Sequence, residues 1–249
     1  METADTVAAP RRRTLLRMIR AGGAAAALGA TLAACGKDDR KAAAERTGSR
    51  GTATTTAAVT GSGAPGPDTV MIIRHGEKPK EEGDSAPYGV TEQGEKSEHA
   101  LLVRGWQRAG ALVALFAPDA ATPPRAGLRR PETVYAAGPH GGKSLRPSET
   151  VTPLAAKLGT PLKLDHRTGD EAALARELLA RHGTTLVSWE HHRISDIVKG
   201  LGRVHPAPPA AWPDDRFDLV WVFTRDGDGW TFAQVPQLLL DGDRPDPAR

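Results

Sequence analysis

Apolar runs that stop abruptly at polar residues constrain the fold of this chain more than any other feature of its sequence. TVMIIR (69–74) leads into a histidine and a glycine, and TTLVSWEHH (184–192) ends in a glutamate and two histidines. A continuous apolar run predicts a strand that is covered on both faces, as in a parallel sheet flanked by helices. We therefore expect an α/β domain with polar residues at the ends of its strands.

The segments around these strands complete the predicted architecture. Apolar periodicity and end signals predict a strand over 132–137 and helices over 101–116, about 148–158, 168–183 and 194–202. The runs RFDLVWVF (216–223) and WTFAQVPQLLL (230–240) flank Asp-Gly pairs, which indicate a hairpin. The predicted fold is a three-layer α/β/α sandwich with a mostly parallel sheet and a C-terminal antiparallel hairpin.

Residues 1–34 have the layout of an export signal. A basic cluster, RRRTLLR (11–17), precedes an apolar stretch and then small residues before Cys35. RRRTLLR resembles the twin-arginine export motif, and LAAC (32–35) resembles a bacterial lipobox, whose cysteine is lipidated after cleavage. We expect an exported envelope protein whose membrane contact is a lipid anchor at Cys35, outside the cytoplasmic membrane or in the periplasm.

The segment 35–67 differs in composition from the rest of the chain. It is rich in Gly, Ala, Thr and Ser and poor in large apolar residues, so it cannot bury enough surface to order itself. We interpret it as a disordered tether and place the folded domain at 68–249. Cys35 is the single cysteine, so the domain has no disulfide and depends on its core.

The charge balance gives no indication of a nucleic-acid partner. The formal net charge is +3, but residues 1–34 hold five of the 33 basic residues and two of the 30 acidic ones, so 28 of each remain. A positive site must therefore be local.

Two arginines and two histidines lie where strand ends are expected. Arg74 and His75 follow the first strand, Arg146 lies in SLRPSET (144–150), and His191 follows the strand at 184–189. In open α/β sheets, ligands bind at the carboxyl ends of strands. Guanidinium groups bind phosphate oxygens, and imidazoles supply a nucleophile and a hydrogen-bond donor. This set of residues favours a site for a phosphoryl group.

The ordered motifs RHGE, SLRPSET and WEH resemble those of the histidine phosphatase superfamily, also called the phosphoglycerate-mutase-like family, over about 68–243. The resemblance implies that His75 is the nucleophile and becomes a phosphohistidine. It also implies that Arg74 and Arg146 hold the phosphoryl oxygens and that His191 donates to them. A small phosphorylated substrate is implied, with no cofactor and no metal.

The general acid that protonates the leaving alcohol is not fixed by a motif. We place Glu77 first, because it follows the nucleophile closely, and keep Glu190 and Glu149 as alternatives. An acid must hold a proton near neutral pH, which neighbouring arginines oppose, so it should lie at the pocket edge. Asp214 is expected to belong to a turn, together with Asp215.

The resulting hypothesis is hydrolysis of an extracytoplasmic phosphomonoester through a phosphohistidine at His75. A mutase is disfavoured, because phosphoglycerate mutases act on cytoplasmic metabolites. Two alternatives stay open: a non-catalytic phosphate-ligand-binding lipoprotein and a phosphohistidine-protein phosphatase. A zinc site is disfavoured because no two histidines are four residues apart, and His192 is expected at the surface.

Overall fold

The computed structural model describes residues 68–80 and 86–248, which form seven strands and four helices. Their order is β1 (Thr69–Arg74), α1 (Val103–Phe116), β2 (Thr133–Ala136), α2 (Arg146–Leu158), β3 (Leu162–Lys163), α3 (Glu171–Ala180), β4 (Thr184–Trp189), α4 (His191–Gly200), β5 (Val204–His205), β6 (Leu219–Asp226) and β7 (Gly229–Pro236). Within this part of the chain, no helix combines the length and the apolar character that crossing a membrane requires. The predicted export signal, Cys35 and the predicted tether lie outside the described residues.

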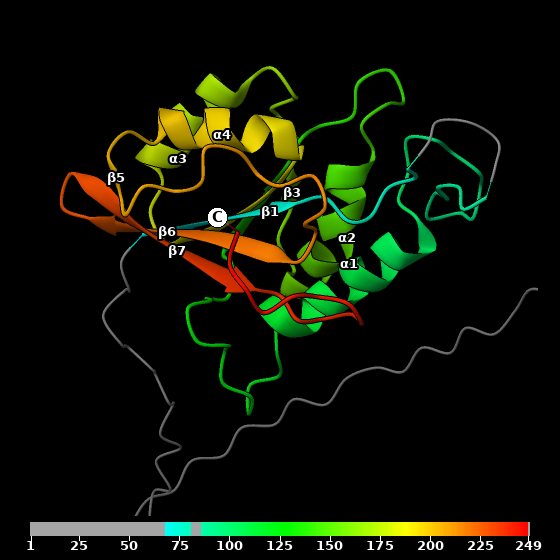
Figure 1. The fold of residues 1–249 in the computed structure, drawn as a ribbon, viewed down its shortest axis with the longest axis horizontal. Helices are drawn as coiled ribbons and strands as arrows, with labels where there is room; N and C mark the ends of the chain where they lie inside the picture. Colours follow the sequence, from blue (N-terminus) through cyan, green and yellow to red (C-terminus); the bar gives the residue numbers. More distant parts are fainter. Residues whose placement is uncertain (1–67, 81–85, 249) are drawn as a thin grey trace, which may run out of the picture. The chain divides into compact units, whose positions relative to one another are not determined.

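The strands form one sheet in the order β3-β2-β4-β1-β6-β7-β5 (Figure 1). Strands β3, β2, β4 and β1 pair in parallel with one another, whereas β6 is antiparallel to both β1 and β7. At the far edge, β5 is parallel to β7. The predicted fold class is confirmed, including the C-terminal hairpin of β6 and β7.

Helices α1 and α2 cover one face of the sheet, and α3 and α4 cover the other (Figure 1). Val70 and Ile72 of β1 pack into the core beneath α3 and α4, whereas Met71 and Ile73 pack into the core beneath α1 and α2. Successive side chains of a strand point to opposite faces, so a strand covered on both sides needs an unbroken apolar run. This packing explains the sequence of β1.

The last of the predicted helices begins earlier than its sequence pattern indicates. The pattern places it at 194–202, but α4 starts at His191, directly after Glu190. His191 is 2% exposed and faces the interior, whereas the side chain of His192 is 64% exposed. The expected surface position of His192 is therefore correct, although it lies in a helix and not in a strand.

Candidate active site

Two neighbouring parallel strands bring the first group of polar residues together. Arg74 of β1 is in register with Trp189 of β4, and the backbone N–H of His75 donates to the carbonyl of Trp189 at 3.0 Å. Parallel strands end at the same edge of a sheet, so His75 and His191 follow adjacent strand ends. Their ring centroids are 6.2 Å apart, and the rings are nearly perpendicular.

His75 is 2% exposed, and its ring is held in one orientation by the backbone of the next residue. Its Nδ1 donates to the carbonyl oxygen of Gly76 at 2.7 Å. A carbonyl can only accept, so the proton is on Nδ1 and the lone pair of Nε2 is free. Burial lowers the pKa of His75 to about 3, and the charges of Arg74 and Arg146 act in the same direction. This imidazole is therefore neutral and nucleophilic at physiological pH.

Arg74 is 1% exposed and is fixed by the loop before β6. One terminal nitrogen donates to the carbonyl oxygens of Asp214 at 2.5 Å and Arg216 at 3.4 Å, and the guanidinium lies 3.7 Å from the ring centre of Phe217. Burial lowers its pKa to about 10, so the side chain keeps its charge at neutral pH. Its buried Nε–H has no acceptor among the described residues. A buried charged donor without a partner indicates a place for an anion.

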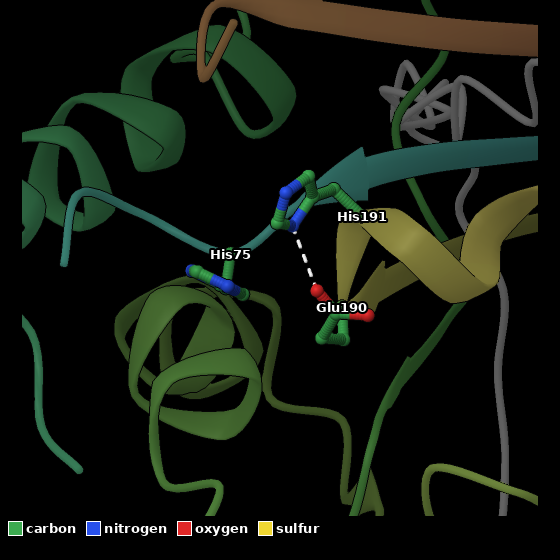
Figure 2. A group of neighbouring side chains, drawn as sticks. All are labelled: His75, Glu190 and His191. Carbon is green, nitrogen blue, oxygen red and sulfur yellow. Dashed lines mark ion pairs between the residues drawn. The ribbon is translucent and has the colours of Figure 1, made fainter. Parts of the chain in front are cut away.

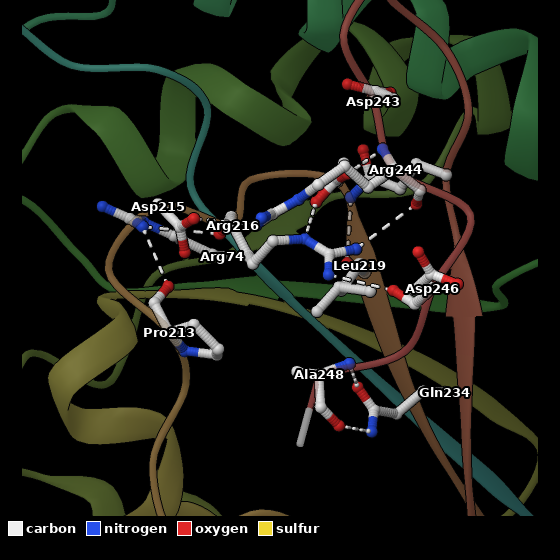
Figure 3. Close-up of polar contacts among 12 residues, drawn as sticks. Arg74, Pro213, Asp215, Arg216, Leu219, Gln234, Asp243, Arg244, Asp246 and Ala248 are labelled. Atoms are coloured by element: carbon white, nitrogen blue, oxygen red, sulfur yellow. Dashed lines mark hydrogen bonds and ion pairs between the residues drawn. The ribbon is translucent and has the colours of Figure 1, made fainter.

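The loop that holds Arg74 is itself fastened by the end of the described chain (Figure 3). Nε of Arg216 donates to Asp218 Oδ1 at 2.6 Å, and one terminal nitrogen donates to the carbonyl of Asp246 at 2.9 Å. Gln234 and the backbone of Ala248 exchange two further hydrogen bonds, at 2.9 and 3.0 Å. The C-terminal segment therefore sets the position of Arg74 through Arg216.

His191 has a carboxylate next to each ring nitrogen. Glu190 Oε1 lies 2.8 Å from Nδ1, and Asp214 Oδ1 lies 3.0 Å from Nε2. Figure 2 shows the Glu190 contact and the neighbouring His75. Burial raises the pKa of Glu190, but the contact with His191 and the backbone N–H of His192 lower it to about 2 overall. Glu190 is therefore ionised at neutral pH, and the His191 ring lies between two carboxylates.

Arg146 lies in the first turn of α2, close enough for its charge to act on His75. Its Nε donates to the carbonyl of Ala100 at 3.2 Å, and a terminal nitrogen donates to the carbonyl of Glu98. Thr150, one turn later, accepts a hydrogen bond from the N–H of Gly76 at 2.8 Å. The start of α2 is thus attached to the loop that carries His75, and the charge of Arg146 contributes to the low pKa of that residue.

Glu77, the expected acid, is held by arginines. Its Oε1 lies 2.8 Å from a terminal nitrogen of Arg108 and 3.3 Å from Nε of Arg104. Arg108 is 2% exposed and also binds Asp243 at 2.7 Å. Arginine nitrogens donate to both oxygens of this carboxylate, so the contacts fit a positioning role better than that of a proton donor. The sequence could not indicate this, because Arg108 lies 31 positions from Glu77.

A cavity of about 910 Å³ lies beside Arg74, Glu77 and His191, whereas His75 and Arg146 are not among its lining residues. Arg74, His191 and Phe217 form part of its wall, together with the cationic side chains of Lys78 and Arg104. Asp214, which the sequence assigned only to a turn, also lines it. No periodicity marks that segment, and its place at the pocket depends on the path of the chain between α4 and β6.

Within residues 68–80 and 86–248, two groups of side chains have donor atoms close enough to hold a metal ion. They are His75, Glu190 and His191, and His191, His192 and Asp214; within each group the donor atoms lie within 4.8 Å of one another. Both groups include His191. Neither shows the helical histidine spacing for which a sequence can be searched.

No family model matches the sequence, and no curated protein matches it. Solved structures are similar in fold. The protein histidine phosphatase SixA in complex with tungstate is 19% identical and gives a TM-score of 0.44, with 68% of this chain and 97% of that chain covered. A mycobacterial glucosyl-3-phosphoglycerate phosphatase in complex with VO3 is 14% identical, with a TM-score of 0.41 and 67% and 97% covered. An alpha-ribazole phosphatase from Shigella flexneri is 14% identical, with a TM-score of 0.39 and 66% and 94% covered. At this level of similarity, what the chain does must be inferred from its own residues.

Proposed function

We propose that this protein hydrolyses phosphomonoesters through a phosphohistidine intermediate at His75. The observation that carries the proposal is the pairing of a buried, neutral imidazole, whose Nε2 lone pair is free, with the buried guanidinium of Arg74, whose Nε–H lacks an acceptor among the described residues. A phosphoryl group satisfies both, since its oxygens accept from arginine while its phosphorus accepts the lone pair.

The reaction has two steps at the same phosphorus. In the first, a bond forms from His75 Nε2 to phosphorus while the bond to the leaving oxygen breaks. In the second, water attacks phosphorus, the nitrogen–phosphorus bond breaks and inorganic phosphate leaves. Arg74, Arg146 and His191 stabilise the charge on the phosphoryl oxygens in both steps. Each step has a lower barrier than direct attack of water on the ester.

The proton for the leaving group comes, in this proposal, from the pair of His191 and Asp214. Since Nδ1 of His191 faces Glu190, the proton on Nε2 lies next to Asp214 Oδ1, 3.0 Å away. The Asp214 side chain is 79% exposed and lines the cavity, so it reaches the pocket edge. Glu190 is ionised, and Glu77 is bound by Arg108, so neither competes for this role. Glu77 instead positions the loop after His75.

Glu149, the third carboxylate considered from the sequence, has a raised pKa caused by burial. Its Oε2 accepts a hydrogen bond from the backbone N–H of Leu101 at 2.9 Å. We assign it a structural role, because it joins α2 to the segment that precedes α1.

The test is hydrolysis of p-nitrophenyl phosphate by the purified protein. We expect turnover by the wild type, none above background with His75→Ala, and a rate near wild type with His182→Ala. His182 is a matched control, because its side chain is 91% exposed and contacts Asp68, which precedes β1. Substrate with a radioactive phosphoryl group should leave an acid-labile label on the wild type and none on His75→Ala.

The same assay separates the two alternatives. Phosphate binding by the wild type with no turnover above His75→Ala would support a non-catalytic ligand-binding protein. Activity confined to phosphohistidine substrates would support a phosphohistidine-protein phosphatase. The second alternative is favoured by the ion pairing of Glu77, because phosphohistidine has a better leaving group and needs less help from an acid.

Export and lipid attachment at Cys35 are part of the proposal and rest on the sequence of residues 11–35. They imply a substrate outside the cytoplasm. Growth with a labelled fatty acid should label the wild-type protein and leave Cys35→Ser unlabelled. Label retained by Cys35→Ser would contradict the anchor without affecting the assignment of the active site.

A further inference from the structure

Three donor groups meet at the mouth of the cavity. Asp214 Oδ1 lies 3.0 Å from Nε2 of His191 and 3.8 Å from Nδ1 of His192, and the two imidazole centroids are 3.8 Å apart. Two imidazoles and a carboxylate form a ligand set that zinc and related transition metals bind in proteins. We call His191, His192 and Asp214 the mouth triad.

The spacing of the mouth triad is close to that of a tetrahedral metal site. Metal–ligand bonds of roughly 2.0–2.1 Å place tetrahedral ligands about 3.3 Å from each other. The two distances to Asp214 Oδ1, 3.0 and 3.8 Å, lie on either side of that value. The side chains of His192 and Asp214 are 64% and 79% exposed, so they are free of the packing that would oppose a small adjustment. Only His191 has to be fixed in advance, and burial fixes it.

The other nitrogen of His191 has the partner that metal-binding histidines usually have. Glu190 Oε1 lies 2.8 Å from Nδ1. The contact lacks the alignment of a hydrogen bond, but a carboxylate beside this nitrogen orients the ring by its charge and supports the far nitrogen as a ligand. Glu190 therefore prepares Nε2 of His191 to bind a cation beside Asp214.

The local charges also favour a cation at this position. Nε2 of His191 and Oδ1 of Asp214 lie 3.0 Å apart, so both atoms can bind the same cation. Glu190 and Asp214 supply two carboxyl groups around it, which offset the charge of Arg74 and the positive end of α4. The three protein ligands leave a fourth position that faces the cavity.

We propose that the mouth triad binds a divalent transition metal of the zinc class, with Glu190 as the carboxylate that supports His191. The ion lies between Nε2 of His191 and Oδ1 of Asp214. Binding of the metal is independent of the proposed function. One consequence rests on that function: zinc removes both the proton for the leaving group and a donor to the phosphoryl group, so it inhibits hydrolysis.

Binding is measured by competition between the full-length protein and a chromogenic zinc chelator, with ZnCl2 as the probe. All variants carry Cys35→Ser, because a thiolate also binds zinc. We expect one zinc ion per chain, and affinity at least about tenfold weaker for His192→Ala and for Asp214→Asn. The controls are His205→Ala and Asp215→Asn; His205 is exposed in β5, and Asp215 binds Arg244 at 2.9 Å. Mg2+ should not compete, because it prefers oxygen ligands.

Absence of a zinc site in the parent protein would overturn the inference, as would His192→Ala and Asp214→Asn variants that bind zinc like their controls. The second arm measures hydrolysis of p-nitrophenyl phosphate with and without zinc, each variant relative to its own zinc-free rate. Zinc should inhibit the parent protein strongly and His192→Ala weakly. Zinc binding without any hydrolysis in zinc-free buffer would refute the proposed function and leave the metal site intact.

Discussion

Gly76 and Gly105 lie against each other where the loop after β1 crosses α1. A Cβ on Gly76 would lie 3.1 Å from the Cα of Gly105, and a Cβ on Gly105 would lie 2.7 Å from the carbonyl oxygen of Glu77. Neither glycine has a left-handed backbone, so the close approach alone requires them. The loop that carries His75 thus rests directly on the backbone of α1.

This contact predicts the effect of a single methyl group. Gly105→Ala should push the loop off the helix, lower stability by about 1–3 kcal/mol and slow hydrolysis by displacing His75. Gly110→Ala is the matched control, because the same helix has open space there. In the control, the better helix propensity of alanine should stabilise by up to about 1 kcal/mol. Urea denaturation and the turnover rate measure both effects, and equal stability of the two variants would contradict the contact.

The buried network of Arg108 predicts a large difference between two neighbouring arginines. Arg108→Ala leaves the carboxylates of Glu77 and Asp243 without their main partner, which should cost about 3–5 kcal/mol. Arg104→Ala removes a half-exposed partner of the same Glu77 and should cost about 0–1 kcal/mol. Urea denaturation of both variants tests this difference. Similar losses for the two would show that burial does not set the strength of this network.

The low pKa of His75 predicts a pH dependence of stability. The folded state keeps this histidine neutral down to about pH 3, whereas the unfolded chain protonates it near the ordinary histidine pKa of 6.5. Between these values the unfolded state binds more protons, so stability falls as the pH is lowered. The contribution of His75 to this loss is up to about 1.4 kcal/mol of unfolding free energy per pH unit. His75→Asn should lack this contribution. Denaturation at pH 7 and pH 5 should show that the variant loses less unfolding free energy between these pH values than the wild type. Equal losses in the two proteins would argue against a buried neutral His75.

The proton donor can be identified by varying the leaving group. Asp214→Asn should slow hydrolysis of alkyl phosphates by about 100-fold or more, because an alkoxide needs a proton in order to leave. p-Nitrophenol leaves readily as an anion, so its ester should be affected much less. Asp215→Asn, one residue away and bound to Arg244, should change neither rate appreciably. Equal losses on both substrates would assign Asp214 a positioning role instead.

The layers of the fold were predictable because a strand that is buried on both faces has a continuous apolar sequence. The sequence 69–74 needs apolar residues at successive positions to satisfy two cores, and an Asp-Gly pair between two apolar runs favours a tight turn. The edge strands β3 and β5 have two residues each, which is too short for a recognisable apolar pattern. The start of α4 at His191 was missed because its first residues carry polar side chains that belong to the site.

The sequence by itself determined the order of the helices and of the longer strands, and it placed Arg74, His75, Arg146 and His191 at the ends of elements, because local hydrophobic patterns dictate where elements end. Only the tertiary structure decided what each polar group contacts. Arg108 binds Glu77, and Asp214 lies 3.0 Å from His191, through contacts that join residues 31 and 23 positions apart. The protonation and the role of a buried polar group depend on such neighbours, which local sequence does not specify.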